Sequence, residues 1–242
     1  MRDTHKRPTA SKLEFKIRNM KAEDWEGAQR TVCLANGLRA QDGGRWLGRH
    51  SVAEMLERFP EGQFVAVVDD CSTEQVIGVG ITMRTSRTPL ERPLNWFGMI
   101  GSYGLANNDP RGKWLYGVEL AVHPGFQRRG VASALYKARL GLVGKLGLRG
   151  WYAGGMLMGY HAHQDTLSPR DYYEKVLAGE LVDPTVSMQM NRGLRVKGLI
   201  ENYCESAASG NNAALLVWTP PIHVRPRKKP AAAATPTAGA RN

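Results

Sequence analysis

The chain has 242 residues, of which 42% are hydrophobic and 23% are charged, as is usual for a globular protein. Its length allows one large domain or two small ones, and no run of about 18 apolar residues is present that would span a membrane. The first residues lack the apolar core of a secretory signal. Three scattered cysteines (Cys33, Cys71 and Cys204) form no disulfide framework or Cys-x-x-Cys metal site. We therefore expect a reducing, cytoplasmic location.

The net charge of +11 is concentrated at the two ends of the chain. Residues 1–12 carry +3 and residues 225–242 carry +5, which leaves +3 for the body. The C-terminal end is rich in Pro, Ala and Thr and has no apolar periodicity. We therefore expect disordered basic tails over 1–12 and 223–242 around a folded domain over 13–222. Such tails can contact RNA or acidic surfaces weakly, but a solvated tail is the simpler interpretation.

The first half of the chain is expected to form a strand, two helices and a β-hairpin. Strict alternation over 13–18 predicts a half-buried strand. Ser51 with Glu54 three residues later predicts an N-capped helix that ends before Pro60. The helices are predicted over 22–36 and 52–59, and the hairpin strands over 64–69 and 75–85. The connection 86–113 is longer than most loops and contains Trp96, Phe97, Met99 and Tyr103, so we expect it to cover a pocket.

The second half adds four strands and three helices. The strands are predicted over 115–122, 150–155, 194–201 and 213–218, and the helices over 131–146, 170–178 and 183–191. Ser168 is the expected N-cap before Pro169, and Gly147 is expected to end the central helix. This order of elements predicts a mixed α/β sheet with one parallel crossover at its centre.

The segment between the strand 115–122 and the helix after it has the features of an anion site. A strand that leads through a glycine-containing turn into a helix points unpaired N–H groups and the positive end of the helix dipole at one place. Arg128 and Arg129 add positive charge beside Gly130. The spacing fits neither a Walker loop nor a dinucleotide-binding loop. An ordinary strand–turn–helix with a packing glycine is the alternative.

This segment resembles the acyl-coenzyme A loop, Q/R-x-x-G-x-G/A, of the GNAT family of N-acetyltransferases, here Gln127-x-x-Gly130-x-Ala132. The resemblance covers residues 13–219. The second half is most similar to acetyltransferase domains fused to carbon–nitrogen hydrolases in some bacteria, in the stretches LYGVELAVHP, YYEKVLAGELVDP and GLRVKGLIENYCES. The resemblance implies a splayed mixed sheet of about six or seven strands flanked by helices. It also implies acetyl-CoA as co-substrate, a primary amine as acceptor, and no metal.

The resemblance further implies where the co-substrate lies. Backbone groups of Leu120, Ala121 and Val122 would pair with the pantetheine amides. The pyrophosphate would be held by Gln127, Arg128, Arg129, Gly130, Val131 and Ala132. Direct attack by the amine requires that the amine lose a proton, and Glu119, just before the pairing residues, is the candidate general base. Its alternative role is a strand carboxylate paired to a neighbouring arginine.

For the proton donor to the thiolate leaving group, the sequence departs from the family pattern. A family tyrosine that commonly supplies this proton aligns with Gln189, which cannot act as an acid at neutral pH. Tyr173 is the candidate replacement, with Tyr160 and Tyr172 in the same segment, although each also fits a packing role. His161-x-His163 has no third ligand pattern beside it and indicates a histidine pair, not a metal site.

Two functions follow from these observations. The first is an N-acetyltransferase that acts on a small-molecule or peptide amine. The second is a catalytically weak module of the same fold that binds acyl-CoA or a partner protein. We expect no membrane partner and only weak contact with nucleic acid through the tails. A homodimer remains open, as do the amine and the acyl chain.

Overall fold

The computed structural model describes residues 13–39, 46–70 and 73–221. The two expected basic tails and Cys71 lie outside the described residues. Within these residues no helix has both the length and the apolar character needed to cross a bilayer.

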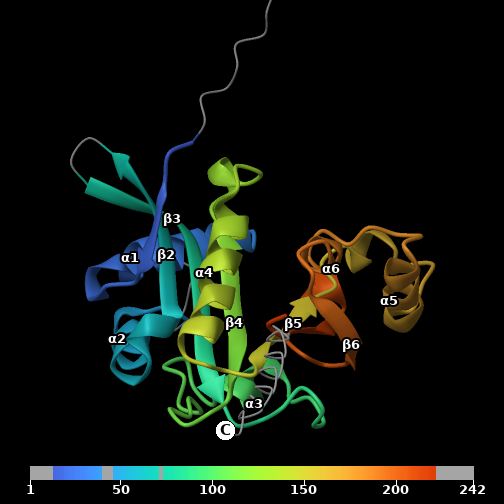
Figure 1. The fold of residues 1–242 in the computed structure, drawn as a ribbon. Coiled ribbons are helices and arrows are strands. Elements are labelled where there is room, and N and C mark those ends of the chain that lie inside the picture. The colour runs from blue at the N-terminus through green and yellow to red at the C-terminus, as the bar shows by residue number, and fades with distance from the viewer. Residues whose placement is uncertain (1–12, 40–45, 71–72, 222–242) are drawn as a thin grey trace, which may run out of the picture.

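A mixed sheet of seven strands forms the centre of the molecule (Figure 1). The strands are β1 (Lys16–Asn19), β2 (Gln63–Asp70), β3 (Thr73–Thr85), β4 (Trp114–Val122), β5 (Gly150–Met156), β6 (Arg195–Ile200) and β7 (Ala213–Trp218). Their order in the sheet is β1-β2-β3-β4-β5-β7-β6. Every neighbouring pair is antiparallel except β4 and β5, which are parallel. The expected mixed sheet with one central parallel crossover is therefore confirmed.

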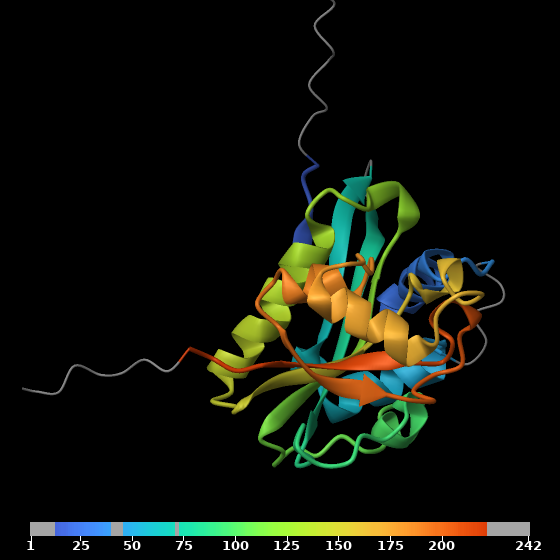
Figure 2. The same ribbon diagram turned by 90° about the vertical axis from the view of Figure 1, so that its right-hand side faces the viewer.

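Helices cover both faces of this sheet (Figures 1 and 2). They are α1 (Trp25–Ala35), α2 (Arg49–Arg58), α3 (Trp96–Ile100), α4 (Val131–Lys145), α5 (Pro169–Ala178) and α6 (Val186–Met190). One hydrophobic cluster joins α1 and α2 to residues such as Val79 and Tyr116. The other joins α4 to residues such as Ala66 and Leu115. Since side chains alternate along a strand, neighbouring residues such as Leu115 and Tyr116 belong to opposite faces.

Several local expectations are confirmed. Ser168 caps α5, and its Oγ accepts a hydrogen bond from Asp171 N at 3.1 Å. The segments 63–70 and 73–85 pair as an antiparallel hairpin. Gly147 follows α4 with φ of +61°, a backbone conformation that a glycine adopts without strain.

Other local expectations are wrong. The first strand begins at Lys16, three residues later than expected. The helix α2 begins at Arg49 with Gly48 as its N-cap, so Ser51 lies inside the helix and is buried. The short helix expected from residue 183 begins at Val186, because the Asp183 carboxylate accepts hydrogen bonds from Thr185 N and Val186 N at 2.8 Å. Tertiary packing and a local cap moved these boundaries.

The two central parallel strands separate after a short paired segment. The strands β4 and β5 pair only over residues 114–116 and 150–152, whereas β4 stays paired with β3 as far as Val122. A β-bulge lies just past the separation, because Ile81 faces Glu119 while Thr82 faces Gly117. Bulges bend a strand and re-aim its side chains. We call this region, with the bulge at Val118 and Glu119, the strand opening.

Candidate active site

The loop after β4 ends in an uncapped helix N-terminus. Gly130 is the N-cap of α4 with φ of +89°, and no side chain caps the helix there. Arg128 also has a positive φ, +58°, which is uncommon for a residue other than glycine. Residues 127–130 are all exposed. The loop therefore presents the first-turn N–H groups of α4 together with two arginines to solvent, as an anion site requires.

A third arginine, which the sequence did not indicate, lies beside the same helix turn. The guanidinium of Arg192 donates to Ser133 Oγ at 2.8 Å and to Met188 O at 2.9 Å. Its Cζ lies 5.6 Å from the centre of the Tyr136 ring. Arg192 follows α6 in the chain and Ser133 belongs to α4, so only the packing of the two helices brings them together.

Beyond the point where β4 and β5 separate, three backbone groups of β4 form hydrogen bonds with side chains. Val118 O accepts a hydrogen bond from Trp96 Nε1 at 3.0 Å. Leu120 N donates to Glu119 Oε1 at 2.9 Å. Val122 O accepts from the side chain of Gln127 at 3.2 Å. These hydrogen bonds satisfy backbone groups that β5 would satisfy in a continuous sheet.

Glu119 lies half-buried at the bulge. Its Oε2 accepts a hydrogen bond from Trp46 Nε1 at 3.4 Å. Burial raises the pKa of Glu119, and the hydrogen bonds from Trp46 and Leu120 N and the charge of Arg139 oppose this rise. Arg139 Nη1 donates to the backbone oxygen of Glu119 at 3.2 Å, not to its carboxylate. The carboxylate is thus oriented while its proton affinity is raised.

Two further aromatic side chains pack against Trp46, the residue that donates to this carboxylate. The ring centres of Trp46 and Trp96 lie 5.0 Å apart, and those of Trp46 and Tyr103 lie 6.0 Å apart. Trp46 precedes α2, Trp96 begins α3, and Tyr103 follows α3. Two of these aromatic residues, Trp96 and Tyr103, come from the connection 86–113, which was expected to cover a pocket. The third, Trp46, was not expected.

On the α4 side of the sheet, the side chain of Arg139 is 1% exposed. Its Cζ lies 4.5 Å from the centre of the Tyr136 ring and 5.3 Å from that of Trp151. Its Nε and Nη2 have no hydrogen-bond partner among the described residues. Tyr136 Oη accepts a hydrogen bond from Gln189 Nε2 at 2.7 Å. A buried cation, a phenol and an amide therefore meet between α4, α6 and β5.

The expected proton donor lies elsewhere. Tyr173 belongs to α5, which lies beyond α6 and β6 from β4 (Figure 1). The structure therefore does not bring Tyr173 beside Glu119. Tyr172 donates to Asp183 Oδ2 at 3.0 Å and Tyr160 donates to Leu167 O at 3.1 Å, so both hydroxyls bind structural partners.

The two histidines of the expected pair, His161 and His163, contact different residues. His163 packs against the Tyr172 ring, with centres 5.3 Å apart. His161 Nδ1 lies 2.9 Å from Met158 O. The part of the chain that the structure describes contains no cluster of three or more potential metal-ligating side chains.

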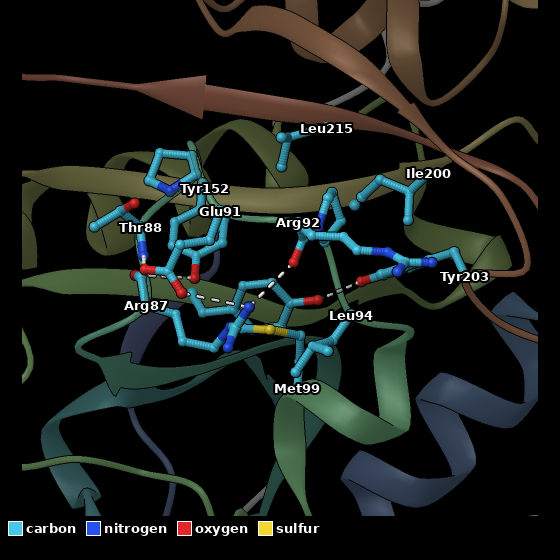
Figure 3. Close-up of a pocket in the computed structure, with 14 residues that line it drawn as sticks. Arg87, Thr88, Glu91, Arg92, Leu94, Met99, Tyr152, Ile200, Tyr203 and Leu215 are labelled. Carbon is cyan, nitrogen blue, oxygen red and sulfur yellow. Dashed lines mark hydrogen bonds and ion pairs between the residues drawn. The ribbon is translucent and has the colours of Figure 1, made fainter.

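A pocket opens where β4 and β5 begin to separate, on the face that carries α1 and α2 (Figure 3). The hydroxyls of Tyr116 on β4 and Tyr203 lie 2.6 Å apart. The Tyr203 ring covers Gly154 of β5, where a Cβ would lie 2.4 Å from Cζ. Residues 87–89, 91–94 and 99 of the connection 86–113 line this pocket, so Met99 is the one of the four residues expected to cover a pocket that lines this one.

Comparison with known proteins finds one matching family model and two similar bacterial proteins. Residues 39–156 match the model of the acetyltransferase (GNAT) family. Over 174 residues the chain is 29% identical to "Probable hydrolase YhcX" of Bacillus subtilis, covering 72% of this chain and 33% of that protein. It is 25% identical to "Uncharacterized N-acetyltransferase YkwB" of the same organism, covering 69% and 72%. The chain thus spans only a third of the first relative, whose name describes a longer protein.

Solved structures show the same fold. The loading GNATL domain of CurA from Lyngbya majuscula superposes with a TM-score of 0.67 at 17% identity, covering 86% of this chain and 98% of that one. The GphF GNAT-like decarboxylase in complex with isobutyryl-CoA gives 0.61 at 19% identity, covering 84% and 98%. These likenesses show that the chain has the fold of the acetyltransferase (GNAT) family, whose model matches residues 39–156, just under half of the chain.

Proposed function

We propose that the chain transfers an acyl group, acetyl in the simplest case, from acyl-CoA to a primary amine. One observation carries this proposal. The strand opening has an uncapped, arginine-rich helix N-terminus at one end and a half-buried carboxylate, Glu119, at its bulge. The helix N-terminus can bind a diphosphate, and the carboxylate can remove a proton from the amine.

The diphosphate of coenzyme A would bind the N–H groups at the start of α4. Arg128 and Arg129 flank that site in the loop, and Arg192 lies against Ser133. Each charge-assisted hydrogen bond contributes about 1.5–3 kcal/mol. Three or four of them, less the cost of ordering the ligand, suffice for micromolar affinity, about −8 kcal/mol.

The pantetheine arm would then lie along β4. Its amides would replace the side chains of Trp96, Glu119 and Gln127 as partners of the backbone groups at 118, 120 and 122. Two of these positions, Leu120 and Val122, belong to the segment 120–122 that sequence resemblance indicates. The exchange of partners leaves the Glu119 carboxylate free to accept a proton.

Glu119 acts as the general base in this proposal. A lysine-like amine with a pKa of about 10.4 is neutral in only about 1 of 2,500 molecules at pH 7, a cost of about 4.6 kcal/mol. A carboxylate whose pKa burial has raised takes the proton from such an amine more readily than an exposed one. Trp46 holds the carboxylate in place from the aromatic side.

Tyr136 is the proton donor that the geometry favours over Tyr173. Gln189 donates to Tyr136 Oη, so the phenol proton stays available for the thiolate. The guanidinium of Arg139, 4.5 Å from the ring centre, would stabilise the phenolate that forms. Gln189 also lies against Gly155 of β5, which places this phenol beside the strand opening.

The experiment is an assay of free coenzyme A thiol with acetyl-CoA and a panel of primary amines. We expect thiol release that depends on the amine. Binding of acetyl-CoA without amine-dependent release would overturn the proposal and support the alternative, a binding module of the same fold. The absence of a tyrosine at Gln189 is the observation that motivates this alternative.

A further inference from the structure

One end of the folded body carries exposed positive residues. Lys113 and Arg149 come directly before β4 and β5, and Arg149 N donates to Lys113 O at 2.8 Å. Lys145 is the last residue of α4, and Arg195 is the first residue of β6. All four residues are exposed. We call these four residues the basic end.

Strand pairing brings these residues to the same end of the sheet. The strands β4 and β5 begin side by side. Trp218 at the end of β7 pairs with Trp151 near the start of β5, and Arg195 at the start of β6 pairs with Val217 of β7. Figure 2 shows the turn that joins α4 to β5 beside the end of β7. Since neighbouring strands lie about 4.8 Å apart, the basic end extends about 14 Å across β4, β5, β7 and β6.

No acidic residue compensates these charges. The sequence has no Asp or Glu between Glu119 and Asp165, none over 184–200 and none after Glu205. The helix α4 and the strands β5, β6 and β7 lie entirely within these ranges. Among the residues that the structure describes, none forms an ion pair with the four basic side chains. The basic end is therefore a surface with one sign of charge.

The acidic residue in the loop before β4, Asp109, does not change this balance. Its carboxylate accepts hydrogen bonds from Ser86 Oγ and Arg111 N. The hydrogen bond from Ser86 lowers the pKa of Asp109, as do that from Arg111 N and the charges of Arg111 and Arg84. Asp109 is therefore paired within its own part of the chain.

The proposed phosphate site does not account for the basic end. That site lies at Gly130, at the N-terminus of α4, whereas Lys145 ends the helix. A helix of 15 residues is about 22 Å long. Because charges in physiological salt are screened beyond about 8 Å, the basic end contributes little to a diphosphate bound at Gly130. It is therefore a separate surface.

The described chain also ends beside this surface. Its last described residue, Pro221, follows the end of β7 by three residues. The sequence after it has five basic residues and no acidic one. These are Arg225, Arg227, Lys228, Lys229 and Arg241. The positive charge of the basic end therefore continues along the sequence.

A surface with one sign of charge suits the phosphate backbone of a nucleic acid. The centre of a protein interface is usually more apolar, and a segment that lies in a membrane surface inserts apolar side chains. In the described part of the chain, the large apolar residues that are exposed all lie outside the basic end. They are Leu38, Leu90, Leu94, Phe97, Leu177 and Val182. We propose that the basic end binds a nucleic acid through its phosphates, without reading the bases. This inference does not depend on the proposed function.

The test measures binding of the full chain to a fluorescently labelled single-stranded RNA of about 20 nucleotides by anisotropy, between 50 and 200 mM salt. The first variant replaces Lys113, Arg149 and Arg195 together with glutamine. The matched control replaces Arg30, Arg49 and Lys137 with glutamine, which removes the same charge from exposed positions on α1, α2 and α4.

We expect the affinity of the wild type to fall steeply as salt rises, because phosphate contacts release counterions. Each contact with a single strand contributes about 0.7 to the slope of log K against log salt, so the basic-end variant should lose about 2 from that slope. The control should keep the slope of the wild type.

Three results would overturn the inference. The first is no RNA binding by the wild type at 50 mM salt. The second is an equal loss in both variants, which would show that net charge alone attracts the RNA. The third is stronger binding to vesicles that contain phosphatidylserine than to RNA, with the same sensitivity to the basic-end variant, which would identify a membrane-binding surface instead.

Discussion

Replacing Glu119 with glutamine removes the expected general base and changes little else. Glutamine keeps the length of the side chain, and its carbonyl oxygen can still accept from Leu120 N as Glu119 Oε1 does. The long contact with Trp46 Nε1, 3.4 Å, is the hydrogen bond that an amide nitrogen cannot accept. Since the substitution lies away from the loop 127–132, we expect the affinity for acetyl-CoA to stay unchanged.

The size of the effect follows from the chemistry of the amine. A positioned general base contributes about 10²–10⁴-fold to the rate. Without it, only the neutral amine reacts, and the neutral fraction rises about tenfold per pH unit below an amine pKa of about 10.4. The wild-type rate should level off above the raised pKa of Glu119, where the carboxylate is ionised. The deficit of the variant should therefore be largest near pH 7 and smaller at pH 9.

The assay is kcat/KM by thiol release between pH 6 and pH 9, with acetyl-CoA affinity measured on the same samples. Equal rates for wild type and Glu119→Gln across this range would refute the base assignment. A uniform deficit at every pH, with weaker acetyl-CoA binding, would show that the side chain acts in binding instead.

Four further results are expected. Acetyl-CoA at 100 times its Kd should stabilise the wild type by about 2.7 kcal/mol, and Gly130→Glu should abolish the resulting Tm shift by placing a carboxylate in the phosphate site. Tyr136→Phe should lower kcat with little change in the KM for acetyl-CoA, whereas Tyr173→Phe should leave kcat unchanged. Arg139→Met should move the acid limb of the pH–rate profile upward, because the charge of Arg139 lowers the pKa of Glu119. Burial raises the pKa of Glu119, so the folded protein binds a proton there more tightly than the unfolded chain does. The stability from this group is therefore present at acid pH and is lost as the pH rises through the folded-state pKa. In chemical denaturation, the free energy of unfolding of Glu119→Gln should rise relative to that of the wild type as the pH increases from 4 to 7.

Control variants and the following outcomes distinguish these specific effects from a general loss of folding. Gly141→Glu on α4 should keep the Tm shift, because nothing lies within 4 Å of a Cβ at that position. Retained acetyl-CoA binding by Gly130→Glu would reject the phosphate site. Equal losses in Tyr136→Phe and Tyr173→Phe would reject a specific acid. If Arg139→Met folds and the acid limb of its pH–rate profile lies at the same pH as in the wild type, Arg139 does not act on Glu119.

The sequence by itself determined the elements and the loop that joins them. The strand 115–122, the glycine-bearing loop and the helix from Val131 are encoded by short-range periodicity and by Gly130, whose positive φ only glycine adopts without strain. The hairpin and the Ser168 cap are equally local. These features were predictable because each depends on residues a few positions apart.

Only the tertiary structure decided which side chains meet at the strand opening. Trp46 reaches Glu119 across 73 positions, and Gln189 reaches Tyr136 across 53. The register in which β3, β4 and β5 pair decides where β4–β5 pairing ends and where the bulge beside Glu119 forms. No local sequence pattern specifies that register. Sequence analysis made Tyr173 a candidate acid because a phenol can donate a proton, yet packing places α5 away from the opening. Hydrophobic burial selects the arrangement of whole elements, and the polar contacts of the site follow from that arrangement.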